Sequence, residues 1–588
     1  MKEFLRSMLA TIAGIIVVGF IFFILSLFTI TGFIAMSESE TTVRENSIFL
    51  LDLTGNVSER YQQNPLDQIL GEKQTTYGLD DILSSIKKAK ENENIKGIYL
   101  NAGAYNCSTA SLQAIRNALV DFKESGKFIV AYSGMYTQSA YYIASVADKI
   151  IVNPSGNIMW HGLSAQTMFF TDLLKKVGIE MQIFRVGTYK SAVEPFTETA
   201  MSQANREQTQ AFVSSLWEQF VTDVSASRNL TPERLNELAD LNMDFQPAET
   251  YIENGLADTL MYKDGVLTYL KKLTDCKEDQ ELSVLTLNDM TNVKRNTPKD
   301  KSGNIIAVYY AYGEIDSQAD IAYDEGINSE KVIKDLRKLR ENKDVKAVVL
   351  RVNSPGGSAY ASEQIWREVS LLKEEKPVIV SMGDYAASGG YYISCAATQI
   401  VAEPTTLTGS IGIFGMFPDV SKLVNEKLDI HIDGVKTNQL SDIGIINRPF
   451  NPEEQALIQN MVNEGYELFT KRCADGRNIP IEELKKIAEG RVWTGAMAKE
   501  LNLVDELGGL DKAIAIAADT ANVENYTILS YPAKEDIFTS LLNINGERYI
   551  KSKVKNLLGN YGNAFMWMNH AAEADRLQAR MPFEYQIK

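Results

Sequence analysis

The feature that most constrains the fold of this chain is an internal repeat with an offset of about 250 residues. Residues 91–100, Glu-Asn-Glu-Asn-Ile-Lys-Gly-Ile-Tyr-Leu, match residues 341–350, Glu-Asn-Lys-Asp-Val-Lys-Ala-Val-Val-Leu. Tyr-Tyr-Ile recurs at 141 and 391 at the same offset. Because these matches keep the same order along the chain, we predict that the body of the protein is one structural unit present twice.

Within each copy, short apolar strands alternate with longer helices. The hydrophobic pattern predicts strands at 47–53 and 304–312 and amphipathic helices at 79–92 and 329–342. This alternation is typical of α/β units with mostly parallel strands. We therefore predict an α/β fold made of two tandem domains.

Composition along the chain sets the expected domain boundaries. The first domain is predicted at residues 45–285 and the second at 304–531. Between them, residues 286–303 are polar and unpatterned, which favours a linker. After these domains, residues 532–588 lack any counterpart in the repeat, and the sequence indicates no role for this tail.

The charge and the metal-binding residue types exclude several functions. A net charge of −17 and a pI near 4.9, without a basic stripe, argue against a nucleic-acid partner, because phosphate binding needs clustered Lys and Arg. The four cysteines are far apart, and the three histidines share no H-E-x-x-H motif. We expect no disulfide framework, no metal site and no cofactor.

The N-terminal segment predicts a membrane anchor. Residues 8–36 carry no charge and would reach about 43 Å as a helix, more than the ~30 Å hydrocarbon core. A cleaved signal peptide is the alternative, but its apolar region is only about 7–15 residues long. Lys2 and Arg6 precede the segment, so residues 1–7 are expected in the cytoplasm and the body outside it.

A candidate nucleophile follows a predicted strand of the second copy. The apolar run 377–381 leads through small residues into a predicted helix at 391–397, which puts Ser388 at a strand-to-helix turn. Such a turn exposes a hydroxyl beside the unpaired N–H groups of a helix N-terminus. A lone Ser-Gly-Gly is more often an ordinary turn, and the first copy has Gln138 at this position.

A glycine-rich segment, Asn-Ser-Pro-Gly-Gly-Ser at 353–358, follows the predicted strand 347–352. Gly356 and Gly357 let the backbone adopt conformations closed to other residues, so a loop here can aim consecutive N–H groups at one point. An oxyanion hole needs such donors, and one donor is worth ~3–4 kcal/mol. In isolation, an ordinary tight turn is the more common explanation of such a segment. The first copy has Gly-Ala-Tyr-Asn-Cys-Ser at 103–108 instead.

A nucleophilic serine also needs a base. His161 and His431 lie near elements of the repeat but not in a comparable turn, so a histidine base remains a weaker alternative. A lysine base must be partly buried, or close to hydrogen-bonding partners that favour the neutral amine, because an ordinary pKa of about 10.4 leaves a gap of ~4.6 kcal/mol to the neutral amine at pH 7. Lys190 follows the predicted strand 181–186, but residue chemistry alone does not select it from the other lysines.

Four motifs stand out in the chain: Arg185-Val-Gly-Thr-Tyr-Lys190-Ser-Ala-Val-Glu-Pro-Phe196, Asn353-Ser-Pro-Gly-Gly-Ser358, Ala387-Ser388-Gly-Gly-Tyr-Tyr392 and Thr408-Gly-Ser410-Ile-Gly412. Together they resemble the long form of the signal peptide peptidase A family, also called protease IV. These are membrane-anchored serine proteases of the ClpP/crotonase superfamily, which have repeated ββα-type units. The order of the motifs, the doubled body and the anchor make the resemblance cover nearly the whole chain.

This resemblance implies the roles of the site residues. Ser388 would be the nucleophile and Lys190 the general base, and Ser410 would hydrogen-bond and orient the lysine amine. Gly356 and Gly357 would form the oxyanion hole. The dyad would then be divided between the copies, with the base in the first and the nucleophile in the second.

When the two copies of the repeat are aligned, the second copy has no lysine at the position of Lys190. Around Lys190 the better register pairs Val186 with Val435, which puts Gln439 opposite Lys190. Lys436 lies nearby but in the wrong register, so we interpret it as a surface residue. One complete site per chain is expected.

The resemblance further implies a function and a location. The family degrades remnant signal peptides and other short hydrophobic peptides at the outer, periplasmic face of the cytoplasmic membrane, and similar proteins form homotetramers. Three alternatives remain. A serine esterase could use the same dyad, although Ala386 replaces the first glycine of the usual G-x-S-x-G elbow. A non-catalytic membrane scaffold and a crotonase-type acyl-CoA enzyme are the others.

Overall fold

The computed structural model describes residues 40–61, 76–294, 300–316, 326–534, 577–581 and 586–587, together with most of 4–24. The predicted anchor at 8–36 falls partly outside these residues, since residues 25–36 are not among them. Residues 10–21 are helical and exposed. In the part of the chain that the structure describes, no helix is both long enough and apolar enough to span a membrane.

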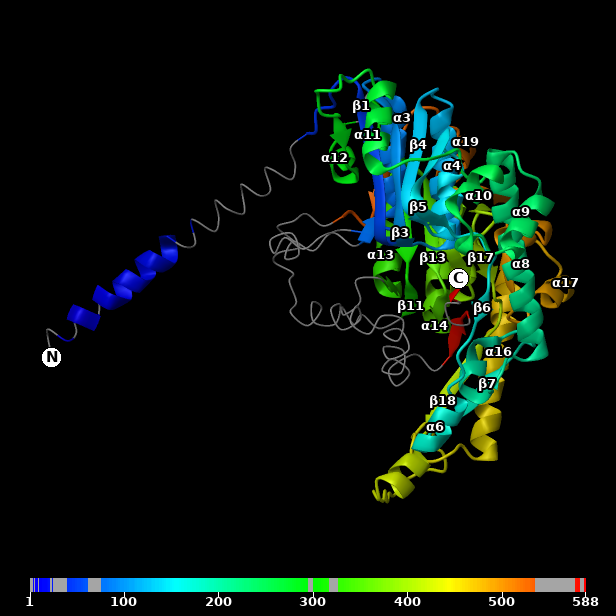
Figure 1. The fold of residues 1–588 in the computed structure, drawn as a ribbon. Coiled ribbons are helices and arrows are strands. Elements are labelled where there is room, and N and C mark those ends of the chain that lie inside the picture. The colour runs from blue at the N-terminus through cyan, green and yellow to red at the C-terminus, as the bar shows by residue number, and fades with distance from the viewer. Residues whose placement is uncertain are drawn as a thin grey trace.

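The first copy is a seven-stranded sheet with helices packed against it (Figure 1). Its strand order is β2-β1-β3-β4-β5-β8, with β9 beside β1, and all its strand pairs are parallel. The strands are β1 (Ser47–Ser58), β2 (Thr76–Gly78), β3 (Ile95–Asn106), β4 (Phe128–Tyr136), β5 (Lys149–Ile158), β8 (Thr259–Leu260) and β9 (Val284–Leu285). The helices of eight or more residues are α3 (Leu79–Glu91), α4 (Thr109–Lys123), α8 (Gln203–Arg228), α9 (Pro232–Asp240) and α11 (Lys263–Leu273).

The second copy is an eight-stranded sheet built in the same way. Its order is β19-β17-β15-β13-β10-β21, with β16 between β15 and β20, and its pairs are parallel except β17 with β19. The strands are β10 (Ile305–Tyr312), β13 (Val345–Ser354), β15 (Val378–Ala387), β16 (Gln399–Ala402), β17 (Leu407–Gly409), β19 (Val492–Thr494), β20 (Glu506–Leu507) and β21 (Thr527–Tyr531). The longer helices are α13 (Ser329–Glu341), α14 (Ala359–Glu375), α16 (Pro452–Arg477) and α19 (Leu510–Thr520).

Equivalent side chains make equivalent contacts in the two copies. The short helices α5 (Gln138–Ala144) and α15 (Gly389–Ser394) each follow a central strand. Tyr141 of α5 donates its hydroxyl to the Leu256 carbonyl at 3.0 Å. Tyr391 of α15 donates to the Leu503 carbonyl at 2.9 Å. The predicted α/β repeat is confirmed.

The predicted linker begins with ordered structure. Residues 284–285 form β9 beside β1, and α12 (Leu287–Thr291) follows within residues 286–303. Thr286 and Asp289 form a capping box at the start of α12. Leu287 and Met290 are buried in the core of the first copy. The first copy therefore extends into the segment whose polar composition indicated a linker.

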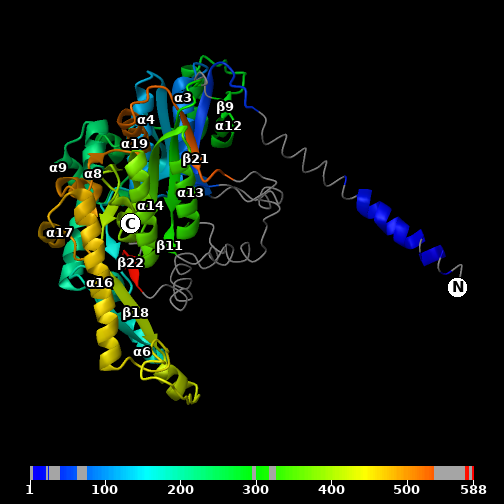
Figure 2. The ribbon, with the colours of Figure 1, turned by 180° about the vertical axis from the view of Figure 1, so that it is seen from behind.

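A third, six-stranded sheet joins the two copies and the tail. Its order is β12-β11-β14-β22-β18-β7. The strands are β7 (Glu180–Arg185), β11 (Glu314–Asp316), β12 (Gly326–Asn328), β14 (Gly356–Ser358), β18 (Phe414–Asp419) and β22 (Gln578–Arg580). β7 belongs to the first copy and pairs antiparallel with β18 of the second. Figures 1 and 2 show this pair extending into an arm beside α16.

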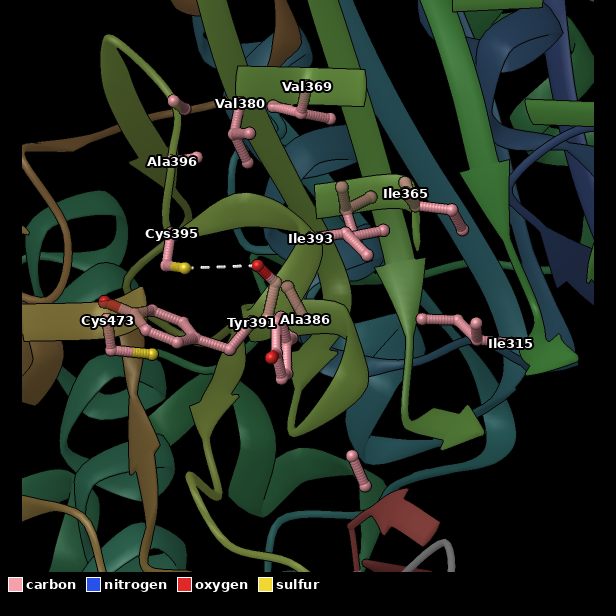
Figure 3. Close-up of a cluster of buried hydrophobic side chains, with 14 of the residues drawn as sticks. Ile315, Ile365, Val369, Val380, Ala386, Tyr391, Ile393, Cys395, Ala396 and Cys473 are labelled. Atoms are coloured by element: carbon pink, nitrogen blue, oxygen red, sulfur yellow. Dashed lines mark hydrogen bonds between the residues drawn. The ribbon is translucent and has the colours of Figure 1, made fainter. Parts of the chain in front are cut away.

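A buried apolar cluster surrounds α15 (Figure 3). Ile393 lies beside Ile365 of α14, whereas Tyr391 and Cys395 face Cys473 of α16, and all five side chains are fully buried. A helix of six residues is not stable by itself in water, so this packing must hold it. The cluster therefore fixes the N-terminus of α15, where Ser388 lies.

Candidate active site

Ser388 lies at the N-cap of α15, directly after β15. Its backbone has φ 54° and ψ −111°, a conformation that residues other than glycine rarely adopt. A 2.7 Å hydrogen bond from its N–H to the Gly409 carbonyl holds it there, and its side chain is fully buried. The predicted strand-to-helix turn is present.

Two glycines let α15 approach the end of β13. A Cβ added at Gly389 would lie 2.7 Å from Ser362 Oγ, and one added at Gly390 would lie 2.7 Å from the Ser354 carbonyl oxygen. Any larger residue would move the helix away, because real Cβ atoms do not come so close. The glycines after Ser388 thus bring the serine next to the Gly356-Gly357 backbone.

Lys190 reaches Ser388 from the other copy. It follows β7 and precedes a 3-10 turn at Ser191–Val193. Its Nζ lies 2.8 Å from Ser388 Oγ, 3.0 Å from the Ser410 carbonyl oxygen and 3.1 Å from Ser410 Oγ. The serine and the lysine are 198 residues apart, and pairing of β7 with β18 brings them together.

Burial favours the neutral form of the Lys190 amine. The Lys190 side chain is fully buried, and loss of hydration lowers its pKa well below the ordinary value. A neutral amine has two N–H groups and one lone pair. The Ser410 carbonyl oxygen can accept a hydrogen bond from one N–H of the amine, and Ser410 Oγ can accept one from the other. The lone pair of the amine then faces the Ser388 hydroxyl. An amine in this state can take the serine proton.

Two further glycines, to which the sequence patterns assign no role, make room for the lysine. A Cβ added at Gly490 would lie 2.7 Å from Lys190 Cβ and 2.8 Å from its Cα, and Gly490 has φ +78°. A Cβ added at Gly412 would lie 3.3 Å from Lys190 Cδ. Gly412 belongs to a motif quoted above, whereas a single glycine such as Gly490 carries no sequence signal before the contact is known.

Gln208 of α8 is a further residue at the site to which the sequence patterns assign no role. It is fully buried, and its Nε2 donates to the Tyr189 carbonyl at 3.0 Å and to Ser191 Oγ at 2.9 Å. Its Oε1 accepts the N–H of Val492 at 3.2 Å. The Gln208 side-chain amide therefore hydrogen-bonds the residues on either side of Lys190 and also a residue of β19. In the sequence, Gln208 is one polar residue within a long helix, and nothing marks it.

Gly356 and Gly357 form a strand rather than the predicted loop. They belong to β14, which lies between β11 and β22, with φ 106° and 153°. The prediction was wrong because a strand this short is defined by its neighbours and not by its own residues. A Cβ added at Gly356 would lie 2.9 Å from the Gly389 N atom. The glycine backbone and the helix N-terminus after Ser388, the two expected sources of oxyanion donors, are therefore adjacent.

A buried polar network from both copies supports the start of this glycine segment. Asn353 Nδ2 donates to Glu59 Oε2 and to Asp384 Oδ2, both at 3.1 Å, and its Oδ1 accepts the Tyr385 N–H. Burial, and secondly the charge of Glu59, raise the pKa of Asp384 above its ordinary value. Arg351 pairs with Glu59 at 2.6 Å. Because Glu59 comes from the first copy, that copy also holds the start of the glycine segment in place.

The equivalent position in the first copy has different chemistry. Gln138 Nε2 donates to the Gly162 carbonyl, and its Oε1 accepts the N–H groups of His161 and Gly162. The imidazole of His161 lies 3.9 Å from Asp244, and His431 is exposed. Lys190 is the residue that hydrogen-bonds the Ser388 hydroxyl, so the geometry favours a lysine over a histidine base.

The second copy offers no buried counterpart of Lys190 among the residues that the structure describes. Lys436 is on the surface, as predicted, with its Nζ 2.9 Å from Asp442 Oδ1. Gln439 is exposed and donates to Glu453. The described residues thus bring together one serine and one lysine, consistent with a single site per chain.

Comparison with protein families finds matches in both copies of the repeat. The model of peptidase family S49 matches twice, at residues 121–277 and 370–524. The Clp protease model matches residues 303–406. A solved structure of a ClpP1 point mutant from Listeria monocytogenes aligns with 19% identity and a TM-score of 0.24, covering 35% of this chain and 94% of that one.

Curated relatives match over most of the chain. "Protease 4" of Salmonella typhi is 37% identical over 512 residues, which is 84% of this chain and 81% of that protein. "Serine protease SPPA, chloroplastic" of Arabidopsis thaliana is 34% identical over 82% of this chain and 70% of its own. "Putative signal peptide peptidase SppA" of Enterococcus faecium is 35% identical over 35% of this chain and 60% of its own.

The doubled α/β fold and these relatives define a serine protease that acts on peptides. The two regions that match the model of peptidase family S49 lie one in each copy of the repeat. The chain belongs to peptidase family S49.

Proposed function

We propose that this protein is a membrane-anchored serine endopeptidase in which Ser388 is the nucleophile and Lys190 the general base. The observation that supports it most is the 2.8 Å contact between Lys190 Nζ and Ser388 Oγ, with both side chains fully buried. A surface lysine would be protonated at neutral pH, whereas this one has a pKa well below its ordinary value because it is buried.

In the proposed acylation step, Lys190 takes the Ser388 proton as the serine oxygen attacks the carbonyl carbon of the peptide bond. Backbone N–H groups of β14, at Gly356 and Gly357, and of Gly389 at the start of α15 stabilise the oxyanion. Lys190 then gives its proton to the leaving amine as the C–N bond breaks. The product is an acyl-enzyme on Ser388 and a released peptide with a new N-terminus.

Deacylation repeats the sequence with water as the nucleophile. Lys190 takes a water proton, hydroxide oxygen adds to the acyl carbon, and the proton returns to Ser388 Oγ as the ester bond breaks. Ser410 acts as a positioning residue, because its carbonyl and hydroxyl occupy the two amine N–H groups and leave the lone pair for the reaction. Each step uses groups of this chain alone.

The substrates in this proposal are cleaved signal peptides and other short hydrophobic peptides. The relative described as a putative signal peptide peptidase supports this class. Residues 8–36 anchor the chain in the cytoplasmic membrane, with the N-terminus in the cytoplasm and the body on the outer, periplasmic side. Four chains form a homotetramer that encloses the sites and excludes folded proteins.

Hydrolysis of a quenched hydrophobic peptide by the purified chain tests the catalytic assignment. We expect Ser388→Ala and Lys190→Ala to lose at least about 1,000-fold in kcat with unchanged circular dichroism. Covalent labelling by a serine-directed inhibitor, located by peptide mass mapping, identifies the nucleophile independently. Labelling of another serine, or a Lys190→Ala variant with full activity, would refute the dyad.

A further inference from the structure

Arg491, the residue directly before β19, places its guanidinium against two aromatic rings. Its Cζ lies 4.7 Å from the centre of the Tyr189 ring and 4.4 Å from the centre of the Trp493 ring. Tyr189 comes from the first copy and directly precedes Lys190, whereas the other two residues belong to the second copy. A planar cation can lie against both rings, and each contact is attractive because the face of an aromatic ring is negative. These side chains therefore connect the two copies next to the lysine.

The backbone of Arg491 contacts the other partner of the lysine. Ser410 donates its N–H to the Arg491 carbonyl at 2.7 Å. Ser410 has φ 51°, a left-handed conformation that residues other than glycine rarely adopt, so it needs such a bond to hold it. The carbonyl and the hydroxyl of Ser410 lie 3.0 and 3.1 Å from Lys190 Nζ. Arg491 thus contacts both the segment that carries the amine and the residue that accepts its hydrogen bonds.

The Trp493 ring is fixed by contacts of its own. Its Nε1 donates to the Ile487 carbonyl at 3.0 Å. A Cβ added at Gly409 would lie 2.8 Å from Trp493 Cδ1, so the ring packs directly on the Gly409 backbone. The Gly409 carbonyl accepts the N–H of Ser388 at 2.7 Å. The guanidinium therefore lies on a ring that is held against the backbone of the nucleophile.

Hydrogen bonding does not account for the Nε atom of Arg491. This atom is buried and has no hydrogen-bond partner within the part of the chain that the structure describes. A buried N–H without a partner lowers stability, so its presence calls for another explanation. An apolar side chain of the same length would avoid this cost, but it would lose the contacts of a planar cation with the two rings.

We infer that Arg491 is a positioning residue for the pair formed by Ser388 and Lys190. This inference rests on the proposed function. The guanidinium holds Tyr189 and, with it, the backbone of Lys190. The Arg491 carbonyl holds Ser410, so the lone pair of the amine stays directed at the serine hydroxyl. A displacement of the amine by ~1 Å would cost roughly 100-fold in rate while the protein stays folded.

Steady-state hydrolysis of a hydrophobic peptide by the full-length, detergent-solubilised chain tests this role. Arg491→Met keeps the length of the side chain but loses the charge and the planar group. Its kcat should fall at least about tenfold, while KM changes less than about threefold. Arg491→Lys keeps a cation that can lie on one ring and should recover part of kcat. Each kcat is referred to the folded fraction of the chain, measured by circular dichroism.

A matched variant separates positioning from a loss of stability. Arg116 of α4 also lies over a ring, that of Tyr142 at 5.4 Å, and its Nε is likewise buried without a partner among the described residues. Arg116→Met should lower the unfolding temperature and keep the parental kcat. A parental kcat in Arg491→Met, or equal losses in the two variants, would overturn the inference. A parental kcat in Lys190→Ala would instead refute the proposed function.

A double-mutant cycle tests the connection through Tyr189. Tyr189→Leu removes the ring that joins the guanidinium to the lysine segment. If the Arg491 side chain acts through this ring, the chain with both Tyr189→Leu and Arg491→Met should lose little more kcat than either single variant. Losses that multiply, as they do for independent sites, would contradict the positioning role.

Discussion

Ser111 of the first copy donates both its backbone N–H and its hydroxyl to the carboxylate of Asp384 in the second copy, each at 2.8 Å. Asp384 in turn accepts a hydrogen bond from Asn353, the residue that begins the glycine segment. Four residues after Asp384 the chain reaches Ser388. The first copy thus contacts the strand that carries the nucleophile as well as supplying the lysine.

This relationship predicts that Ser111→Ala lowers activity although the side chain does not touch the reacting atoms. The variant leaves a buried carboxylate with one hydrogen bond fewer, which should cost about 1–3 kcal/mol of stability. We expect kcat to fall more than KM rises, because the glycine segment that begins at Asn353 shifts while the rest of the site remains. Thermal unfolding and steady-state kinetics check this. Ser111→Thr, which keeps the hydroxyl, should recover part of kcat, and a variant with parental kcat would exclude the positioning role.

Lys190→Met should abolish turnover and stabilise the fold at neutral pH. In the unfolded chain the lysine is protonated up to a pKa of about 10.4, whereas burial holds the folded-state pKa well below that. Between these two values the unfolded state binds more protons, so the stability of the parent chain rises with pH. Removing the amine removes this cost, about 1.4 kcal/mol for each unit of pKa depression, so the gain is largest at low pH and shrinks toward pH 10.

Chemical unfolding of the parent and Lys190→Met chains at pH 7 and pH 10 measures this difference. Lys436→Met is the control, since that lysine is exposed and should change neither stability nor activity appreciably. Similar activity losses in the two variants would rule out the assignment of the base.

The rate of peptide hydrolysis should fall in acid. A protonated Lys190 cannot take the serine proton, so kcat/KM should drop about tenfold per pH unit below the folded-state pKa of the amine. That pKa lies below the ordinary lysine value because the side chain is buried, and the enzyme should therefore be active near neutral pH. A profile of kcat/KM from pH 5 to pH 10 tests this, and a flat rate from pH 9 down to pH 5 would count against a lysine base.

Gly490→Ala should reduce kcat about 100-fold by displacing the lysine. The added Cβ would meet the Lys190 backbone at 2.8 Å, and the glycine has φ +78°. Gly126→Ala provides the control, because Gly126 has φ +75° and no atom within 4 Å of its Cβ position. Both variants carry the same backbone strain, so both should lose stability, but Gly126→Ala should keep its activity. Equal kcat values for the two variants would show that the contact with Lys190 does not matter.

Locally encoded elements were predicted closely from the sequence. The helix expected at 329–342 is α13 (Ser329–Glu341), and the strand expected at 304–312 is β10 (Ile305–Tyr312). In both, the hydrophobic period and the end signals lie within the element itself.

Elements that depend on distant partners could not be predicted from residue patterns. Lys190 was selected only through family resemblance, because its burial results from β7 pairing with a strand of the other copy. The Gly356-Gly357 segment is a strand because β11 and β22 lie beside it. β22 itself is a short stretch of mixed polarity with no apolar periodicity, and its structure comes from pairing with β14 and β18.

Lys190 and Ser388 come from two copies of the repeat within one chain, and this affects how the fraction of assembled sites depends on protein concentration. If the two halves were separate polypeptides, the fraction of assembled sites would fall on dilution, as in any bimolecular complex. Covalent linkage makes their association intramolecular, with an effective concentration fixed by the chain. Synthesis of each polypeptide also delivers the proposed base, Lys190, and the proposed nucleophile, Ser388, in a one-to-one ratio.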